Sequence, residues 1–148
     1  MATIDSEVLA EFGGALEDLF RAVLKASGRG VPGGETELTM SQYFVMDALA
    51  GDRLAMSELA RAARVAVPTA TRAVAALERR GFVDRTRDGE EDRRVVTVAL
   101  SRAGRVVLDE KRTWVAQRQR EIFDGLSAAE RRTVVRTLDR LARDIGEL

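Results

Sequence analysis

Eight charged side chains gather between residues 85 and 94, and carboxylates at this density could hold a hard cation or act as an acid–base pair. They are Arg85, Arg87, Asp88, Glu90, Glu91, Asp92, Arg93 and Arg94. Neither chemistry has the further ligand or nucleophile that it needs. The 148 residues contain no Cys and no His, which removes thiol catalysis, disulfides and the usual zinc ligands. We therefore expect no enzyme activity, no metal site and no cofactor.

The same arginines suit another partner, the negatively charged groove of double-stranded DNA. Asp92 is placed to hold Arg94 in one rotamer, aimed at a narrow minor groove where the potential is most negative. Removal of Asp92 should then weaken DNA binding, although Asp92 carries a negative charge that the DNA phosphates repel. The residues of this segment that we assign to DNA contact are Arg85, Arg87, Asp92, Arg93 and Arg94.

A second group of side chains with contact chemistry stands at the start of a helix predicted over residues 68–80. Ala73, Val74 and Leu77 have the spacing to pack inward, so the entry end of this helix faces outward. Arg72 could bond guanine through two hydrogen bonds, and the threonines could meet phosphates or a thymine methyl. For any single threonine, capping or simple solvation stays open. The predicted contacts on this helix are Val67, Pro68, Thr69, Thr71 and Arg72.

Both groups need a scaffold, and the intervening residues predict one. We expect a helix opening at residues 56–60, a turn over 64–67, the helix of 68–80 stopped by Gly81, a strand over 82–85, a polar tip over 86–92 and a return strand over 93–100. This order is that of a winged helix-turn-helix, which fits one helix into a major groove. The fold class is mostly α with a small β-hairpin wing (α+β). Thr39 and Ser57, at two further helix starts, are assigned to the DNA backbone.

A formal net charge of zero argues against a nucleic-acid binder until its distribution is considered. Residues 1–60 carry 4 basic and 10 acidic side chains, a net charge of −6. Residues 61–106 carry 11 and 6, a net charge of +5, and residues 107–148 carry 9 and 8, a net charge of +1. The positive charge therefore lies in the predicted winged helix-turn-helix.

The remaining sequence predicts long amphipathic helices. The first runs from Asp5 or Ser6 to residue 27, and Gly13 and Gly14 in it suggest a close helix crossing, a kink or a tolerated weak point. Thr39 with Gln42, and Ser127 with Glu130, have capping-box spacing at the start of two later helices. Between those two starts, Ser101 can cap a long helix over residues 102–124.

Three long amphipathic helices at the two ends of the chain have too little partner surface in a compact lobe. We therefore expect a C2 homodimer, with closure of a monomeric bundle as the alternative. The expected division is 1–36 for an N-terminal dimerisation helix and loop, 37–104 for the DNA-binding lobe and 105–148 for C-terminal dimerisation helices, in one structural domain overall. The sequence starts without a signal-like apolar region and has no membrane-length apolar run, so we expect a cytoplasmic location.

Several of these motifs resemble the MarR family of winged helix-turn-helix transcriptional regulators. The matching segments are LTMSQ at residues 38–42, MSELA at 56–60, TATR at 69–72, LERRGFVDR at 77–85 and DRRVVTVALSRAG at 92–104. The resemblance implies an obligate dimer that binds a pseudo-palindromic promoter site and represses by blocking access. It also implies release by a small, often aromatic or phenolic effector bound between the dimerisation helices and the lobe.

Two departures from the family pattern bear on what can be carried over. Ala66 stands where a capping Ser is common, and Val67-Pro68 places an apolar step at the base-reading end, so the operator sequence is not transferable. The effector-binding residues are unknown. Four residues could line such a pocket but are expected to be ordinary core: Phe12, Tyr43, Met46 and Trp114. A winged-helix adaptor or antirepressor that acts through protein contacts is the alternative function.

Overall fold

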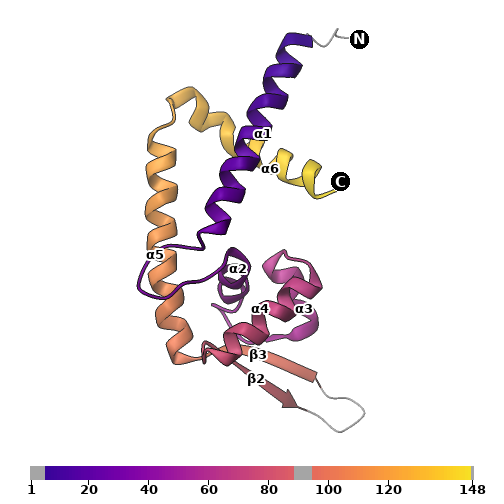
Figure 1. Ribbon diagram of the computed structural model, residues 1–148, viewed down its shortest axis with the longest axis vertical. Coiled ribbons are helices and arrows are strands. Elements are labelled where there is room, and N and C mark those ends of the chain that lie inside the picture. Colours follow the sequence, from indigo (N-terminus) through magenta and orange to yellow (C-terminus); the bar gives the residue numbers. More distant parts are fainter. Residues whose placement is uncertain (1–5, 89–94, 148) are drawn as a thin grey trace. The chain divides into compact units, whose positions relative to one another are not determined.

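A computed structural model describes residues 6–88 and 95–147, and its elements follow the predicted order with one addition (Figure 1). The helices are α1 (Ser6–Gly28), α2 (Met40–Ala48), α3 (Met56–Ala63), α4 (Val67–Arg79), α5 (Arg102–Asp124) and α6 (Ala128–Gly146). The strands are β1 (Leu54–Ala55), β2 (Val83–Asp88) and β3 (Val95–Leu100). The chain forms two compact units, Met1–Lys111 and Arg112–Leu148, and the boundary falls inside α5.

The core of the first unit lies between three short helices and the sheet. Helices α2, α3 and α4 pack against one another, and α4 also packs against β2 (Figure 1). Burial of a Val or Leu side chain contributes about 1.5–3 kcal/mol, so these contacts fix the lobe. The side chains with no exposed surface are Val45, Met46, Leu49, Leu59, Val74, Leu77 and Val98.

The small antiparallel sheet has the strand order β1-β3-β2. Strand β1 was not predicted, because two residues are too few to show a periodic pattern. It pairs with β3, and Leu54 lies opposite Val98. Strand β2 continues to residue 88, whereas the sequence prediction ended it at residue 85. The reason is the ladder itself, since Thr86 pairs with Thr97, and β-branched side chains opposite each other stabilise strand pairing.

The predicted capping boxes are confirmed at two helix starts. At α2, Thr39 Oγ1 accepts from the amide of Gln42 at 3.2 Å, and Gln42 Oε1 accepts from the amide of Thr39 at 3.0 Å. At α6, Ser127 Oγ accepts from the amide of Glu130 at 3.3 Å, and Glu130 Oε2 accepts from the amide of Ser127 at 2.7 Å. Each box satisfies backbone amides that a helix start leaves open.

Helix α1 is continuous through Gly13 and Gly14, and none of its residues is buried. A Cβ added at either glycine would have nothing within 4 Å among the described residues of the same unit, so no close helix crossing within that unit explains the two glycines. The apolar side chains of α1 are exposed, and include Phe12 at 48% and Leu24 at 72%. Helix α1 therefore has an apolar face that the described residues of its own unit, Met1–Lys111, do not cover.

The first half of α5 belongs to the core of the lobe and carries a buried cation. Lys111 is 1% exposed, and its ammonium group donates a hydrogen bond to the carbonyl of Gly33 in the loop before α2. Burial lowers the pKa of Lys111, and the positive charge of Arg80 acts in the same direction, while Glu110 and Glu37 oppose it.

Within residues 6–88 and 95–147, no helix is long and apolar enough to cross a membrane.

Candidate nucleic-acid interface

The turn between α3 and α4 sets the angle at which α4 is presented. Arg64 ends α3 in the left-handed conformation with φ of 54°, and the amide of Val65 bonds the carbonyl of Ala60 at 3.0 Å. This closes α3 by satisfying its last carbonyls and redirects the chain within three residues. The tandem helices predicted from the sequence are therefore present, with a sharp turn between them.

Helix α4 presents its entry end to solvent, as predicted. Ala73, Val74 and Leu77 are buried, and Ala70 joins them at 1% exposure. The helix starts one residue earlier than expected, at Val67, and Ala66 makes no side-chain capping bond. Of the five predicted contact residues, four are exposed and Thr69 is half-buried; the exposed ones are Val67, Pro68, Thr71 and Arg72.

The hydroxyl of Thr71 is already committed to its own helix. It donates to the carbonyl of Val67 at 3.0 Å, which is the back-bond that Thr commonly makes within a helix. In this rotamer Thr71 keeps its methyl group and its oxygen lone pairs for a partner, but it has no proton left to donate to a phosphate. A thymine methyl contact is the predicted role that fits this geometry.

The start of α2 lies beside α4 and shares a surface hollow with it. The hollow has a volume of about 320 Å³ and brings Thr39 together with Thr69 and Arg72. Its full lining is Thr39, Ser41, Gln42, Thr69, Arg72, Ala73 and Ala76. Ser57 is exposed in the first turn of α3 and lies outside this hollow. Two predicted backbone and base contacts, Thr39 and Arg72, thus come from different helices to one surface.

The described part of the wing separates its two arginines. Arg87 on β2 is exposed, while Arg85 is half-buried and its Nε lies 3.3 Å from the carboxylate of Glu78 on α4. The predictions for Asp92, Arg93 and Arg94 lie outside the described residues and stay predictions.

Ser101 caps the start of α5, as predicted, and it also bonds the end of α4, a contact that sequence reasoning did not find. Its hydroxyl donates to the carbonyl of Gly81 at 2.6 Å and accepts from the amide of Gly104 at 3.0 Å. Gly81 has φ of +75°, which favours glycine, and a Cβ at Gly104 would overlap the carbonyl of Phe82. The LSRAG end of the segment quoted at residues 92–104 was the available signal for this corner.

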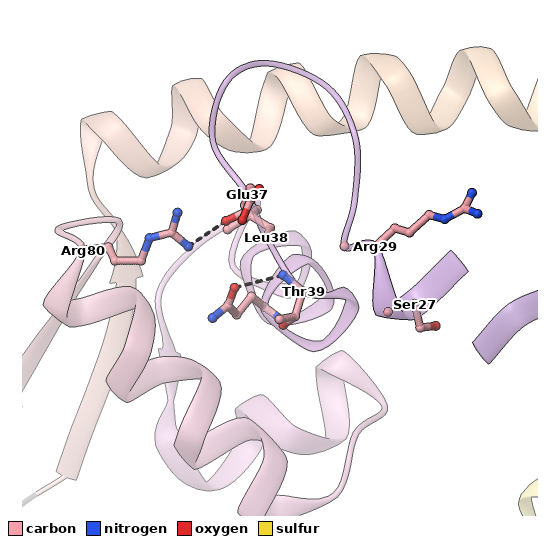
Figure 2. A pocket seen from close by; sticks show the side chains of 9 residues that line it. Ser27, Arg29, Glu37, Leu38, Thr39 and Arg80 are labelled. Atoms are coloured by element: carbon pink, nitrogen blue, oxygen red, sulfur yellow. Dashed lines mark hydrogen bonds between the residues drawn. The ribbon is translucent and has the colours of Figure 1, made fainter. Parts of the chain in front are cut away.

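A second hollow lies between the end of α1, the loop that follows and the start of α2 (Figure 2). Its volume is about 360 Å³. Arg80, the C-cap residue of α4, reaches across to donate to the carbonyl of Glu37 at 2.8 Å, and its guanidinium stacks 4.9 Å from the ring centre of Phe82. Arg29 stands at the opposite side of the hollow from Arg80 (Figure 2).

The four residues considered for an effector pocket divide into two pairs. Tyr43 and Met46 are buried in the lobe, which confirms the expectation that they are core. Phe12 and Trp114 are 48% and 38% exposed in a single chain, and the expectation for these two stays a prediction. Among the described residues, no group of three or more acidic side chains gathers to hold a metal ion.

Residues 38–96 match the sequence model of the MarR family. No protein of curated function matched the chain. Among solved structures, the PcaV transcriptional regulator from Streptomyces coelicolor in complex with its natural ligand is similar at a TM-score of 0.73 and 26% identity, over 97% of this chain and 98% of that one.

Two further structures share the fold. The first is that of Bordetella bronchiseptica BpsR, whose DNA binding is regulated by 6-hydroxynicotinic acid; its TM-score is 0.72 at 22% identity, over 89% of this chain and 98% of that one. The second is Streptococcus pneumoniae FabT in complex with DNA, with a TM-score of 0.66 at 19% identity, over 97% and 99%. These findings agree with the resemblance inferred from the motifs: residues 38–96 are similar to the MarR family, and the fold is that of solved transcriptional regulators.

Proposed function

We propose that this protein is a homodimeric repressor that binds a pseudo-palindromic promoter site and is released from it by a small-molecule effector. The observation that carries the proposal is the exposed entry end of α4, where Arg72 and Thr71 project from a helix whose other side is buried. A major groove admits one helix, and its base edges accept bonds from arginine at guanine and apolar contact at thymine. Arg72 is the base-reading residue, and Thr39 and Ser57 contact the backbone.

The uncovered apolar face of α1 supports the homodimer. Phe12, Phe20, Val23 and Leu24 are between 43% and 72% exposed along this one helix. A soluble protein rarely leaves so continuous an apolar surface open, and a second copy of the same helix covers it symmetrically. A two-fold axis then places two copies of α4 in successive major grooves, about 34 Å apart, which accounts for a pseudo-palindromic site.

Release by a small effector is supported by the regulators of similar fold. BpsR has its DNA binding regulated by 6-hydroxynicotinic acid, and PcaV has been solved with its natural ligand. The hollow beside Arg80 has the size of a small-molecule site at about 360 Å³, and it opens where the loop after α1 meets the lobe. A ligand there would lie next to the C-cap residue of α4, the helix that reads DNA.

Selection of duplexes from a random DNA pool by the full-length protein tests the function directly. We expect an imperfect inverted repeat whose half-sites are about 10 base pairs apart. Arg72→Ala should lose about 1–3 kcal/mol of discrimination at one base pair in each half-site. Arg79→Ala, a change of the same kind in the last turn of α4, is the matched control and should leave the preferred sequence unchanged.

Failure to enrich any duplex would favour the alternative, a winged-helix adaptor that acts through protein contacts. Unchanged base preference in Arg72→Ala would instead remove only the base-reading role of that residue. For the effector, 6-hydroxynicotinate and benzoate are the first probes, and loss of the selected complex on addition of either would support release by an aromatic acid.

A further inference from the structure

Glu78 and Arg85 face each other across the corner between α4 and the wing. Glu78 lies in the last full turn of α4, and Arg85 is the third residue of β2. Arg85 Nε lies 3.3 Å from Glu78 Oε2, and the two side chains are 26% and 45% exposed. The six residues between them contain the whole turn, so this ion pair spans the corner from one element to the other.

Local electrostatics alone do not account for Glu78 at this position. The last turn of a helix carries partial negative charge, which disfavours a carboxylate and favours the arginines that follow at positions 79 and 80. Arg85 supplies the missing compensation from outside the helix. The need is mutual, because Arg85 Nε is buried and has no hydrogen-bond partner among the described residues, so Glu78 is the neighbouring charge that offsets its burial.

The other hydrogen bonds at the corner fix the backbone of the turn, but they do not link α4 directly to β2. The amide of Phe82 bonds the carbonyl of Leu77 at 3.0 Å, and Ser101 holds the carbonyl of Gly81. These contacts fix the turn, whereas Glu78 and Arg85 lie on the helix and the strand that leave it. A pair at these two places restrains the angle between α4 and the β2–β3 hairpin.

We propose that Arg85 is a positioning residue for DNA binding, and that its pairing with Glu78 sets the wing at the angle that lets α4 and the hairpin reach one duplex together. This role replaces the direct DNA contact that the sequence suggested for Arg85, and it rests on the proposed function. Arg87, two residues further along β2 and exposed, keeps the role of a phosphate contact.

For Glu78→Gln, the proposed positioning role and the change in net charge predict opposite effects on the affinity for DNA. Removal of a carboxylate near DNA should tighten binding if charge alone matters. Loss of the restraint on the wing should weaken it, by about threefold to tenfold, because an ion pair of this exposure contributes modestly to the geometry that it holds. Asp84→Asn is the matched control, since it removes an exposed carboxylate from the same strand as Arg85.

The test uses the full-length protein and two duplexes, one selected from the random pool and one shortened so that it lacks the flanks beyond the half-sites, which the wing would contact. Glu78→Gln and Arg85→Gln should each weaken binding to the long duplex about threefold to tenfold and leave binding to the short duplex unchanged. A general loss of folded protein would weaken both duplexes equally. The charge-swapped variant, Glu78→Arg with Arg85→Glu, should recover binding to the long duplex.

The double variant separates positioning from contact. If Arg85 acts only through Glu78, Glu78→Gln combined with Arg85→Gln should weaken binding to the long duplex no more than either single variant does. The proposal is overturned if the double variant binds more weakly than both single variants, or if Glu78→Gln tightens binding as the loss of a carboxylate in Asp84→Asn should. It is also overturned if a swapped variant that melts normally binds as poorly as the single variants. If no duplex is ever selected, the proposed function fails instead.

Discussion

The hydroxyl of Ser101 donates to the carbonyl of Gly81 at 2.6 Å, across a separation of 20 residues. Ser101 directly precedes α5, and Gly81 is the left-handed glycine that ends α4. The same hydroxyl accepts from the amide of Gly104 at 3.0 Å. One side chain therefore ties the end of α4 to the start of α5, the helix that leaves the lobe.

Ser101→Ala should lower the free energy of unfolding by about 1–2 kcal/mol, because it removes a helix cap and leaves the carbonyl of Gly81 without this donor. Ser101→Asp keeps a cap acceptor but has no proton to donate, so its loss should be intermediate. Urea unfolding followed by circular dichroism measures both. Equal stability of Ser101→Ala and the unsubstituted protein would show that the bond to Gly81 contributes nothing.

Gly104→Ala should destabilise the lobe by about 1–3 kcal/mol, the usual cost of overpacking a closed site. The added Cβ would lie 2.9 Å from the carbonyl carbon of Phe82 and overlap its oxygen, and both are backbone atoms that cannot rotate away. Gly146→Ala is the control in α6, where a Cβ has nothing within 4 Å among the described residues. Thermal melting of the two variants should place Gly104→Ala well below the control.

The stability of the protein should depend on pH through Lys111. Its pKa lies below the ordinary value of 10.5, mainly because burial disfavours the charged ammonium. The unfolded chain therefore binds more protons between the lowered pKa and 10.5, so stability due to this group rises with pH through that window and the burial cost is fully present below it. Lys111→Met has no such group.

Urea titrations at about pH 8 and about pH 10 compare the two proteins. The difference in free energy of unfolding should move in favour of the unsubstituted protein as the pH rises. Lys25 is the other lysine of the sequence and is exposed on α1. Lys25→Met should show no such change of the free-energy difference with pH. A difference that stays constant over this range for Lys111→Met would contradict the account of the buried ammonium.

Phe12→Glu should convert the proposed dimer to a monomer, because it places a charge in the apolar face of α1 that a second copy covers. Sedimentation equilibrium measures the mass, and binding to a full inverted repeat should fall towards that of one half-site. Glu11→Gln, at the adjacent exposed position, is the control and should remain dimeric. A Phe12→Glu protein of unchanged mass would point to a different interface or to a monomer.

Local patterns in the sequence were sufficient to predict the elements and their caps. Thr39 with Gln42 predicted a capping box that is present, and Ala73, Val74 and Leu77 predicted the buried side of α4. These features depend on residues three or four apart, so their physics lies within one helix. The two-residue β1 was missed because its pairing with β3 is a contact between distant segments.

The relationships that position the candidate interface were beyond such patterns. Arg85 looked like a DNA contact because it stands among basic residues, whereas its ion pair with Glu78 depends on how the strand returns past the helix. The burial of Lys111 likewise depends on the loop that carries Gly33, 78 residues away in the chain. Charge type is visible in a sequence, but the partner that a charge meets is a property of the fold.

Salt dependence tests most directly whether the positively charged segment 61–106 binds the DNA backbone while α4 reads bases. Fluorescence anisotropy should follow the affinity of the full-length protein for its selected duplex between about 50 and 200 mM salt. With about 6–10 phosphate contacts, the affinity should fall by about a thousandfold or more, along a straight line on logarithmic axes. An affinity that stays constant over this range would show that phosphate contacts are absent and would contradict the assignment of this surface to DNA.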